Sequence, residues 1–238
     1  MKRIVVASVL PFLLGLCQAD AAEVAPPPPI SSNLPANDEV PTAGKWAGIY
    51  LGINGGYGFG SSQWSLAAVT TNAFNTGGFL LGGTIGVNYA VSQVLFGLEG
   101  DLDWSTLNGS VGGCAVNTGG AAAACETKNN LLGTVRARVG YSLDRTLVYV
   151  TGGGAFGSIQ TGLNPPTSFN TAAHLGLAVG AGVEFALSPN WSAKAEYLFL
   201  DFNNASCSGT AACGSAASAA VVLTENIIRG GLNYKFSW

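Results

Sequence analysis

A strict two-residue alternation in residues 227–238 limits the possible folds of this chain more than any other feature. One alternate set is apolar and ends in three aromatics: Ile228, Gly230, Leu232, Tyr234, Phe236 and Trp238. The other set includes the cations Arg229 and Lys235. Successive side chains of a β-strand point to opposite faces, so this segment has one apolar and one polar face. An apolar face that ends in aromatics is typical of a strand in contact with lipid, although the last strand of a soluble β-sandwich would alternate in the same way.

The composition favours the membrane alternative. Mean hydropathy is +0.34 and only 10% of the residues are charged, yet no apolar run approaches the roughly 20 residues that a spanning helix needs. A chain that is apolar overall but nowhere continuously apolar is typical of a transmembrane barrel, and the 34 glycines disfavour helices. A net charge of −3 gives no reason to expect nucleic acid as a partner.

The first 44 residues indicate export. Lys2 and Arg3 precede an apolar stretch at 4–16 and a small-residue cleavage site at 19–21, which predicts a secretory signal peptide at 1–21. Lipoprotein processing at Cys17 is the less favoured alternative. Residues 22–44 are rich in proline and predict an extended or disordered periplasmic leader, in preference to a site for a proline-binding partner.

The remainder, 45–238, predicts an all-β fold: an eight-stranded antiparallel transmembrane β-barrel. The expected strands are 46–60, 77–91, 93–106, 130–143, 146–158, 172–187, 190–203 and 221–238. Tight turns alternate with long connections at 61–76, 107–129, 159–171 and 204–220, as outer-membrane barrels alternate periplasmic turns with outer loops. An even strand number places both termini in the periplasm and the long loops outside the cell. The surrounding partners would be outer-membrane lipid and lipopolysaccharide.

The charged residues of the expected strands fall on the polar faces. They are five acids and five bases: Glu99, Asp101, Asp103, Glu184, Glu196, Arg136, Arg138, Lys194, Arg229 and Lys235. Side chains fill the interior of an eight-stranded barrel, and buried charges are costly unless they pair, so we expect a salt-bridged core. The alternative is that these charges line a pore. The expected strand at 146–158 does not alternate cleanly, and its faces are not assigned.

The exported chain keeps four cysteines, which lie in two short segments. We expect the disulfides Cys114–Cys125 and Cys207–Cys213, because each closes a short local loop. Free thiols and a crossed pairing remain open. No histidine lies near either pair, so neither a metal site nor a cofactor is predicted.

Two motifs that could carry chemistry do not predict a site. The glycine pattern at 152–157 lacks the following helix and acid that a dinucleotide site requires. The single histidine, His174, has no spacing to serine or aspartate that supports a catalytic triad. We therefore predict no catalytic residues and no enzymatic activity.

Five motifs resemble one known family: 46–52 (WAGIYLG), 134–141 (TVRARVGY), 144–153 (DRTLVYVTGG), 188–197 (SPNWSAKAEY) and 229–236 (RGGLNYKF). They are similar to the small outer-membrane β-barrel proteins of alphaproteobacteria, which include porin-like proteins and surface antigens. The resemblance implies a fold like the membrane domain of OmpA. It also implies that Tyr234, Phe236 and Trp238 form the signal read by the barrel-assembly machinery. The chain departs from the family in its final tryptophan and its two cysteine pairs.

Three functions are consistent with these observations. The first is a structural barrel with a salt-bridged interior and exposed loops, which contributes to envelope integrity. The second is a small passive porin for hydrophilic solutes. The third is a surface receptor or adhesin whose disulfide-closed loops bind a host or extracellular ligand, with haem as one candidate that the resemblance implies. The sequence does not identify that ligand.

Overall fold

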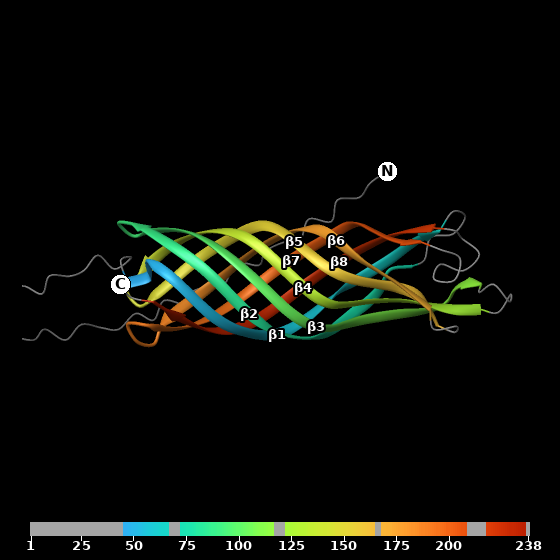
Figure 1. Cartoon of the computed structure of the whole chain (residues 1–238), viewed down its shortest axis with the longest axis horizontal. Helices are drawn as coiled ribbons and strands as arrows, with labels where there is room; N and C mark the ends of the chain where they lie inside the picture. The colour runs from blue at the N-terminus through green and yellow to red at the C-terminus, as the bar shows by residue number, and fades with distance from the viewer. Residues whose placement is uncertain (1–44, 67–71, 117–121, 165–167, 209–217, 237–238) are drawn as a thin grey trace, which may run out of the picture. The chain divides into compact units, whose positions relative to one another are not determined.

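The computed structural model describes residues 45–66, 72–116, 122–164, 168–208 and 218–236. The eight strands are β1 (Gly48–Leu66), β2 (Phe74–Val91), β3 (Val94–Val116), β4 (Ala122–Leu143), β5 (Thr146–Asn164), β6 (Ser168–Ala186), β7 (Trp191–Ser208) and β8 (Ser218–Lys235). Each pairs with its sequence neighbours and β8 pairs with β1, which closes an antiparallel barrel and confirms the predicted fold (Figure 1). The predicted signal peptide and leader lie outside the described residues and stay predictions.

Three tight turns lie at one end of the barrel, together with the start of β1 and the end of β8 (Figure 1). The β2–β3 and β4–β5 turns contain two residues each. Ser92 in the first turn and Asp144 in the second have a positive φ. Short connections of this kind suit adjacent antiparallel strands. We call this the turn end, and the opposite end the far end. No helix in the ranges that the structure describes is long and apolar enough to cross a bilayer.

The strands are longer at the far end than predicted, and this is a correction. Much of the predicted long connections, including 107–116 and 122–129, continues as strand. The Gly, Ser, Thr and Asn residues there resemble a loop in composition, but their backbones remain paired across strands, as Ser61 does with Thr224. Cross-strand pairing at the far end thus replaces much of the predicted loop structure.

The outer face of the wall is apolar over a continuous band. Leu175 is 79% exposed, and Phe79 and Tyr89 are each 70% exposed. Aromatic residues flank this band near both ends: Trp191 packs against Tyr234 at the turn end, and Tyr57 packs against Phe79 farther along the barrel. An exposed apolar band between aromatic residues is the surface that a barrel presents to lipid.

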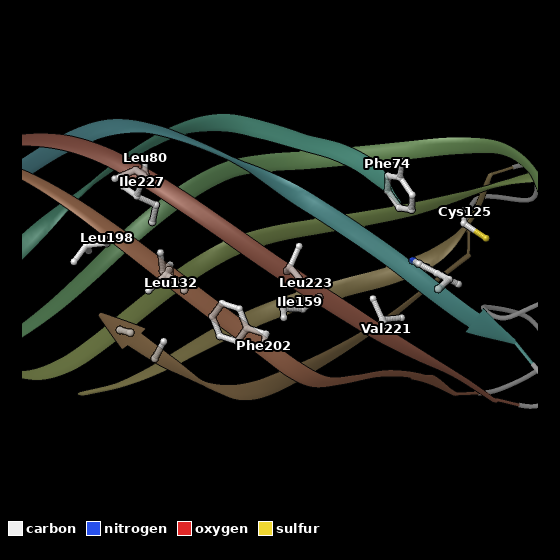
Figure 2. Close-up of a cluster of buried hydrophobic side chains, with 14 residues drawn as sticks. Phe74, Leu80, Cys125, Leu132, Ile159, Leu198, Phe202, Val221, Leu223 and Ile227 are labelled. Atoms are coloured by element: carbon white, nitrogen blue, oxygen red, sulfur yellow. The ribbon is translucent and has the colours of Figure 1, made fainter. Parts of the chain in front are cut away.

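The interior contains two different layers. Toward the turn end it is charged, and toward the far end it is apolar, which the sequence did not lead us to expect. The apolar cluster consists of Trp64, Phe74, Leu80, Cys125, Leu132, Ala155, Ile159, Ala178, Leu198, Leu200, Phe202, Val221, Leu223 and Ile227 (Figure 2). Strand β5 contributes Ala155 and Ile159 to this interior, while Val150 and Phe156 face outward. The unassigned faces of this strand are thereby determined.

The turn end is narrowed by the residues that precede β1. Lys45 and Trp46 form a short 3-10 turn, and Gly48 follows with a φ of +125°. This backbone conformation is rarely adopted by other residues. Trp46 is only 5% exposed and belongs to a small apolar group with Leu95 and Tyr149 inside the barrel mouth. The chain therefore places an indole ring across the turn-end opening.

Candidate functional site

Nine charged side chains form one cluster inside the barrel, which we call the charged layer. Its members are Glu99, Asp101, Asp103, Arg136, Arg138, Glu184, Lys194, Glu196 and Arg229, and none is more than 5% exposed. Strand register explains why they meet. Glu99 pairs with Arg136 across β3 and β4, and Glu196 pairs with Arg229 across β7 and β8. On each of these strands, the residues two positions away point to the same face, so they also enter the interior of the barrel.

Arg136 links three carboxylates from two different strands. Its Nη2 lies 2.6 Å from Glu99 Oε1 and 2.6 Å from Asp101 Oδ2, and its Nη1 lies 3.0 Å from Glu196 Oε1. The Nε of Arg136 donates to Thr134 Oγ1 at 3.0 Å. A planar guanidinium with five N–H donors suits such multiple contacts better than an ammonium does. Arg136 therefore connects β4 to β3 and to β7.

Arg229 makes the corresponding links from β8. Its Nη2 lies 2.9 Å from Asp101 Oδ2, its Nη1 lies 3.2 Å from Asp103 Oδ2, and its Nε donates to Glu196 Oε2 at 2.8 Å. Asp101 and Glu196 are thus shared between Arg136 and Arg229. The two guanidinium groups and their shared carboxylates form the centre of the charged layer.

Arg138 and Lys194 extend the network toward the turn end. Arg138 Nη2 lies 2.8 Å from Glu184 Oε2, and Lys194 Nζ lies 3.0 Å from Glu99 Oε2. The Arg138 guanidinium also lies 4.0 Å from the centroid of the Tyr149 ring, close enough for a cation–π contact. Tyr50 donates to Glu99 Oε2 at 2.7 Å and accepts from Arg138 Nη1 at 2.9 Å.

Neutral side chains complete the coordination of the carboxylates. Thr84 and Thr134 donate to Asp101 at 2.7 and 2.9 Å. Ser192 and Asn233 donate to Glu184 at 2.5 and 2.8 Å. Buried charges are tolerable when both pairing and hydrogen bonds replace water, and these contacts meet that condition for Asp101 and Glu184. Asp103 Oδ1 and Arg138 Nε have no hydrogen-bond partner among the described residues.

Inward-facing glycines are part of this packing. A Cβ on Gly82 would lie 2.0 Å from Asp103 Oδ1, and a Cβ on Gly153 would lie 2.1 Å from the Val135 carbonyl oxygen. Neighbouring atoms therefore occupy the space that these glycines leave. The charged layer is a filled cross-section of the barrel.

Lys235, the tenth predicted member of the network, does not join it. Its Nζ donates to the Lys45 carbonyl oxygen at the turn-end rim. Alternation correctly gives the inward face, but Lys235 is the last residue of β8 and lies beyond the layer. Three interior residues were absent from the predicted site: Tyr50, Tyr149 and Glu225. Glu225 shares the parity of Arg229 on β8, and this signal was available in the sequence.

Glu225 is buried on the far-end side of the charged layer, among the residues of the apolar cluster. Asn129 Nδ2 lies 3.2 and 3.4 Å from its two carboxylate oxygens. Among the described residues, no cation lies within 4.0 Å of this carboxylate. Glu225 is therefore chemically distinct from the paired acids below it.

The predicted disulfides lie at the far end. Cys125 is fully buried and disulfide-bonded, and the β3–β4 register brings the backbone of Cys114 near it, in the irregular stretch between Val111 and Ala115. The side chain of Cys114 is outside the described part, so this pairing stays a prediction. The same holds for Cys207–Cys213, because Cys213 lies outside the described residues.

The remaining predicted residues are placed as follows. Tyr234 and Phe236 face outward at the turn end with ring centroids 5.2 Å apart, while Trp238 lies outside the described residues. His174 is half-buried on β6. Within the ranges that the structure describes, no three His, Cys, Asp or Glu side chains gather in a way that would hold a metal ion.

A closed barrel with a lipid-facing apolar wall and a polar layer inside defines a β-barrel protein of the outer membrane. Residues 10–236 match the family model described as "Outer membrane protein beta-barrel domain", and the chain belongs to this family. Its cellular location is the outer membrane.

Relatives and solved structures agree with this assignment. The chain is 31% identical to the "31 kDa outer-membrane immunogenic protein" of Brucella melitensis biotype 1, over 99% of this chain and 100% of the relative. It is 34% identical to the "22 kDa outer membrane protein" of Rhizobium leguminosarum bv. viciae, over 69% and 68% of the two chains. The outer membrane protein OprG of Pseudomonas aeruginosa superposes with a TM-score of 0.51 at 18% identity, over 80% of this chain and 97% of that chain, which shows a shared fold alone.

Proposed function

We propose that this protein is a structural, non-conducting barrel that contributes to the integrity of the outer membrane. In the proposed orientation the turn end faces the periplasm and the far end faces the exterior. The single observation that carries the proposal is that the interior is filled at successive levels. The charged layer occupies one level, the apolar cluster occupies the next, and Trp46 covers the turn-end mouth.

The apolar cluster is the strongest argument against a hydrophilic pore. Trp64, Ile159 and Phe202 are each 0% exposed, so no solvent reaches them from either end. Figure 2 shows Ile159 and Phe202 with other members of this cluster, which come from several strands. An ion that crossed this level would lose most of its hydration and would meet few polar groups in return, chiefly Glu225 and Asn129.

The charged layer supports a structural role in a different way. Its ion pairs connect strands that are not neighbours, since Arg229 on β8 contacts Asp101 and Asp103 on β3. Such contacts brace the barrel across its diameter, in addition to the hydrogen bonds of the wall. Removal of one partner of a buried pair costs about 3–5 kcal/mol, because the other charge is left buried and unpaired, so the closed barrel depends on the layer remaining intact.

The extended far-end strands support a second candidate, a surface recognition role. Strands β3 and β4 remain paired up to Val116 and Ala122, and the Brucella relatives carry "immunogenic" in their names. We propose this role alongside the structural one, through a far-end ligand that is still to be found. Contact with lipopolysaccharide, and reading of Tyr234, Phe236 and Trp238 by the assembly machinery, are also proposals.

A deletion strain separates the structural role from the pore. A structural barrel predicts faster entry of a lipophilic fluorescent probe after deletion, because the envelope is weakened, with unchanged uptake of a small hydrophilic sugar. A pore predicts slower sugar uptake instead. Complementation with the unaltered gene should restore the probe barrier, and a strain in which only sugar uptake responds would overturn the proposal.

A further inference from the structure

The cations outside the charged layer are unevenly distributed. Four are described: Lys45, Lys128, Arg145 and Lys235. Three of them, Lys45, Arg145 and Lys235, line a single hollow of about 300 Å³ at the turn end. The other wall of this hollow is formed by Ala186, Ser188 and Pro189. Lys128 lies toward the far end, where it pairs with Glu126 at 3.0 Å.

The fold holds these three cations close together. Ala186 N–H donates to the Arg145 carbonyl oxygen at 2.8 Å, which fixes the β4–β5 turn against the end of β6. Lys235 Nζ donates to the Lys45 carbonyl oxygen, which ties the end of β8 to the segment before β1. The segment before β1, the β4–β5 turn and the end of β8 therefore bring the three cations to one part of the rim.

Nearby carboxylates do not neutralise the charge of these three cations. Asp144 lies 3.6 Å from Lys45, and both side chains are at least half exposed, so this pair is weak. Glu184 lies deeper in the mouth, where Arg138, Ser192 and Asn233 occupy its oxygens. Among the described residues, no carboxylate lies within 4.0 Å of Arg145 or Lys235. An excess of positive charge remains at the rim, and it favours an anion.

The position of the hollow indicates which anion. Trp191 lines the adjoining hollow and Phe236 follows Lys235 in the chain, and their side chains are 48% and 42% exposed. Aromatic rings in this position mark the depth of the lipid headgroups. Basic residues at that depth meet lipid phosphates. A single Lys or Arg adds modestly to the affinity for the lipid, and several in a cluster add more.

We propose that Lys45, Arg145 and Lys235 form a binding site for the phosphate of an anionic phospholipid headgroup at the turn end of the barrel. The site would anchor this rim to one leaflet and set the depth of the barrel in the membrane. It does not depend on whether the barrel conducts.

The test uses the full chain, refolded in a detergent without phosphate. Dihexanoylphosphatidylglycerol is titrated, with dihexanoylphosphatidylcholine and inorganic phosphate in parallel arms. Tryptophan fluorescence reports binding, because Trp46 and Trp191 line the adjoining hollow. We expect the anionic lipid to bind at least about tenfold more tightly than the zwitterionic lipid and than inorganic phosphate.

Variants identify the site. Arg145→Gln and Lys235→Gln should each weaken binding of the anionic lipid about fivefold, and the double variant about 20-fold. Lys128→Gln, the matched control at the other end, should bind like the unaltered protein. Circular dichroism of each variant checks that the barrel has folded.

Three results would overturn the proposal. The first is equal binding of the two lipids. The second is binding of inorganic phosphate as tight as that of the anionic lipid, which would identify a site for soluble phosphate. The third is full retention of lipid binding by the folded double variant.

Discussion

Replacement of Arg229 by methionine is the most informative perturbation of the charged layer. Methionine keeps much of the side-chain volume but removes the charge that faces Asp101, Asp103 and Glu196. Asp101 and Glu196 keep Arg136 as a partner, whereas Arg229 is the only cation within 4.0 Å of Asp103 among the described residues. Loss of one partner from a buried ion pair costs about 3–5 kcal/mol, and we expect Arg229→Met to lower the free energy of unfolding by that amount.

A second substitution tests the origin of this loss. Asp103→Asn in the Arg229→Met background removes the carboxylate that was left without a cation, and it should recover about 1–2 kcal/mol. Arg145→Met is the control, because Arg145 is an exposed turn residue, and its effect should stay within about 0.5 kcal/mol.

The assay is reversible urea unfolding in phosphatidylcholine vesicles, followed by tryptophan fluorescence. A loss below about 1 kcal/mol for Arg229→Met would show that water compensates the three carboxylates. That result would refute the description of this layer as a dry, filled section. No recovery in the double variant would show that Asp103 is not the residue left unsatisfied.

Three further predictions use the same assay. Gly153→Ala should destabilise the barrel by about 3 kcal/mol or more, because its Cβ would meet the Val135 carbonyl oxygen at 2.1 Å. The control Gly154→Ala places its Cβ in open space and should be neutral or stabilising. Equal effects of the two substitutions would contradict the packing described for Gly153. Trp46→Ala should lower the free energy of unfolding by about 3–5 kcal/mol, because it removes a buried ring. Trp46→Phe should lower it by less than about 1.5 kcal/mol, because the buried indole nitrogen has no hydrogen-bond partner among the described residues. A reversed order would show that the N–H group matters more than the volume of the ring. Glu225→Gln should stabilise the protein by about 1–2 kcal/mol at neutral pH, since it removes a buried charge whose partner is Asn129; destabilisation would show that the carboxylate is better solvated than its contacts indicate.

The wall of the barrel was predictable from the sequence because its signals are local. Two-residue turns such as Asp144–Arg145 and the alternation around Arg229 determine the strand order and the faces without tertiary information. The charges of the interior follow from the same alternation, since a two-residue period sends Glu99, Asp101 and Asp103 to one side.

The height of each residue in the barrel could not be predicted in the same way. Alternation gives the face of Lys235 but not its place at the rim, and the pairing of Arg136 with Glu196 depends on how the closed barrel staggers its strands. Trp46 was assigned to a strand, yet the backbone at Gly48 turns it into the mouth. The far-end segments are rich in small polar residues, and this composition predicts loops. They form strands because their backbones pair with neighbouring strands. Trp64, which lies in one of those expected loops, belongs to the apolar cluster that closes the interior.

Single-channel conductance of the refolded chain in a planar bilayer tests the central claim most directly. The measurement should be made beside a variant in which Arg136 and Arg138 are both alanine. A filled interior predicts no steady openings from the unaltered protein, and none from the variant as long as the apolar cluster remains closed. Steady openings of the unaltered protein, with a conductance that changes when the arginines are removed, would contradict the account and show that these charges line a pore.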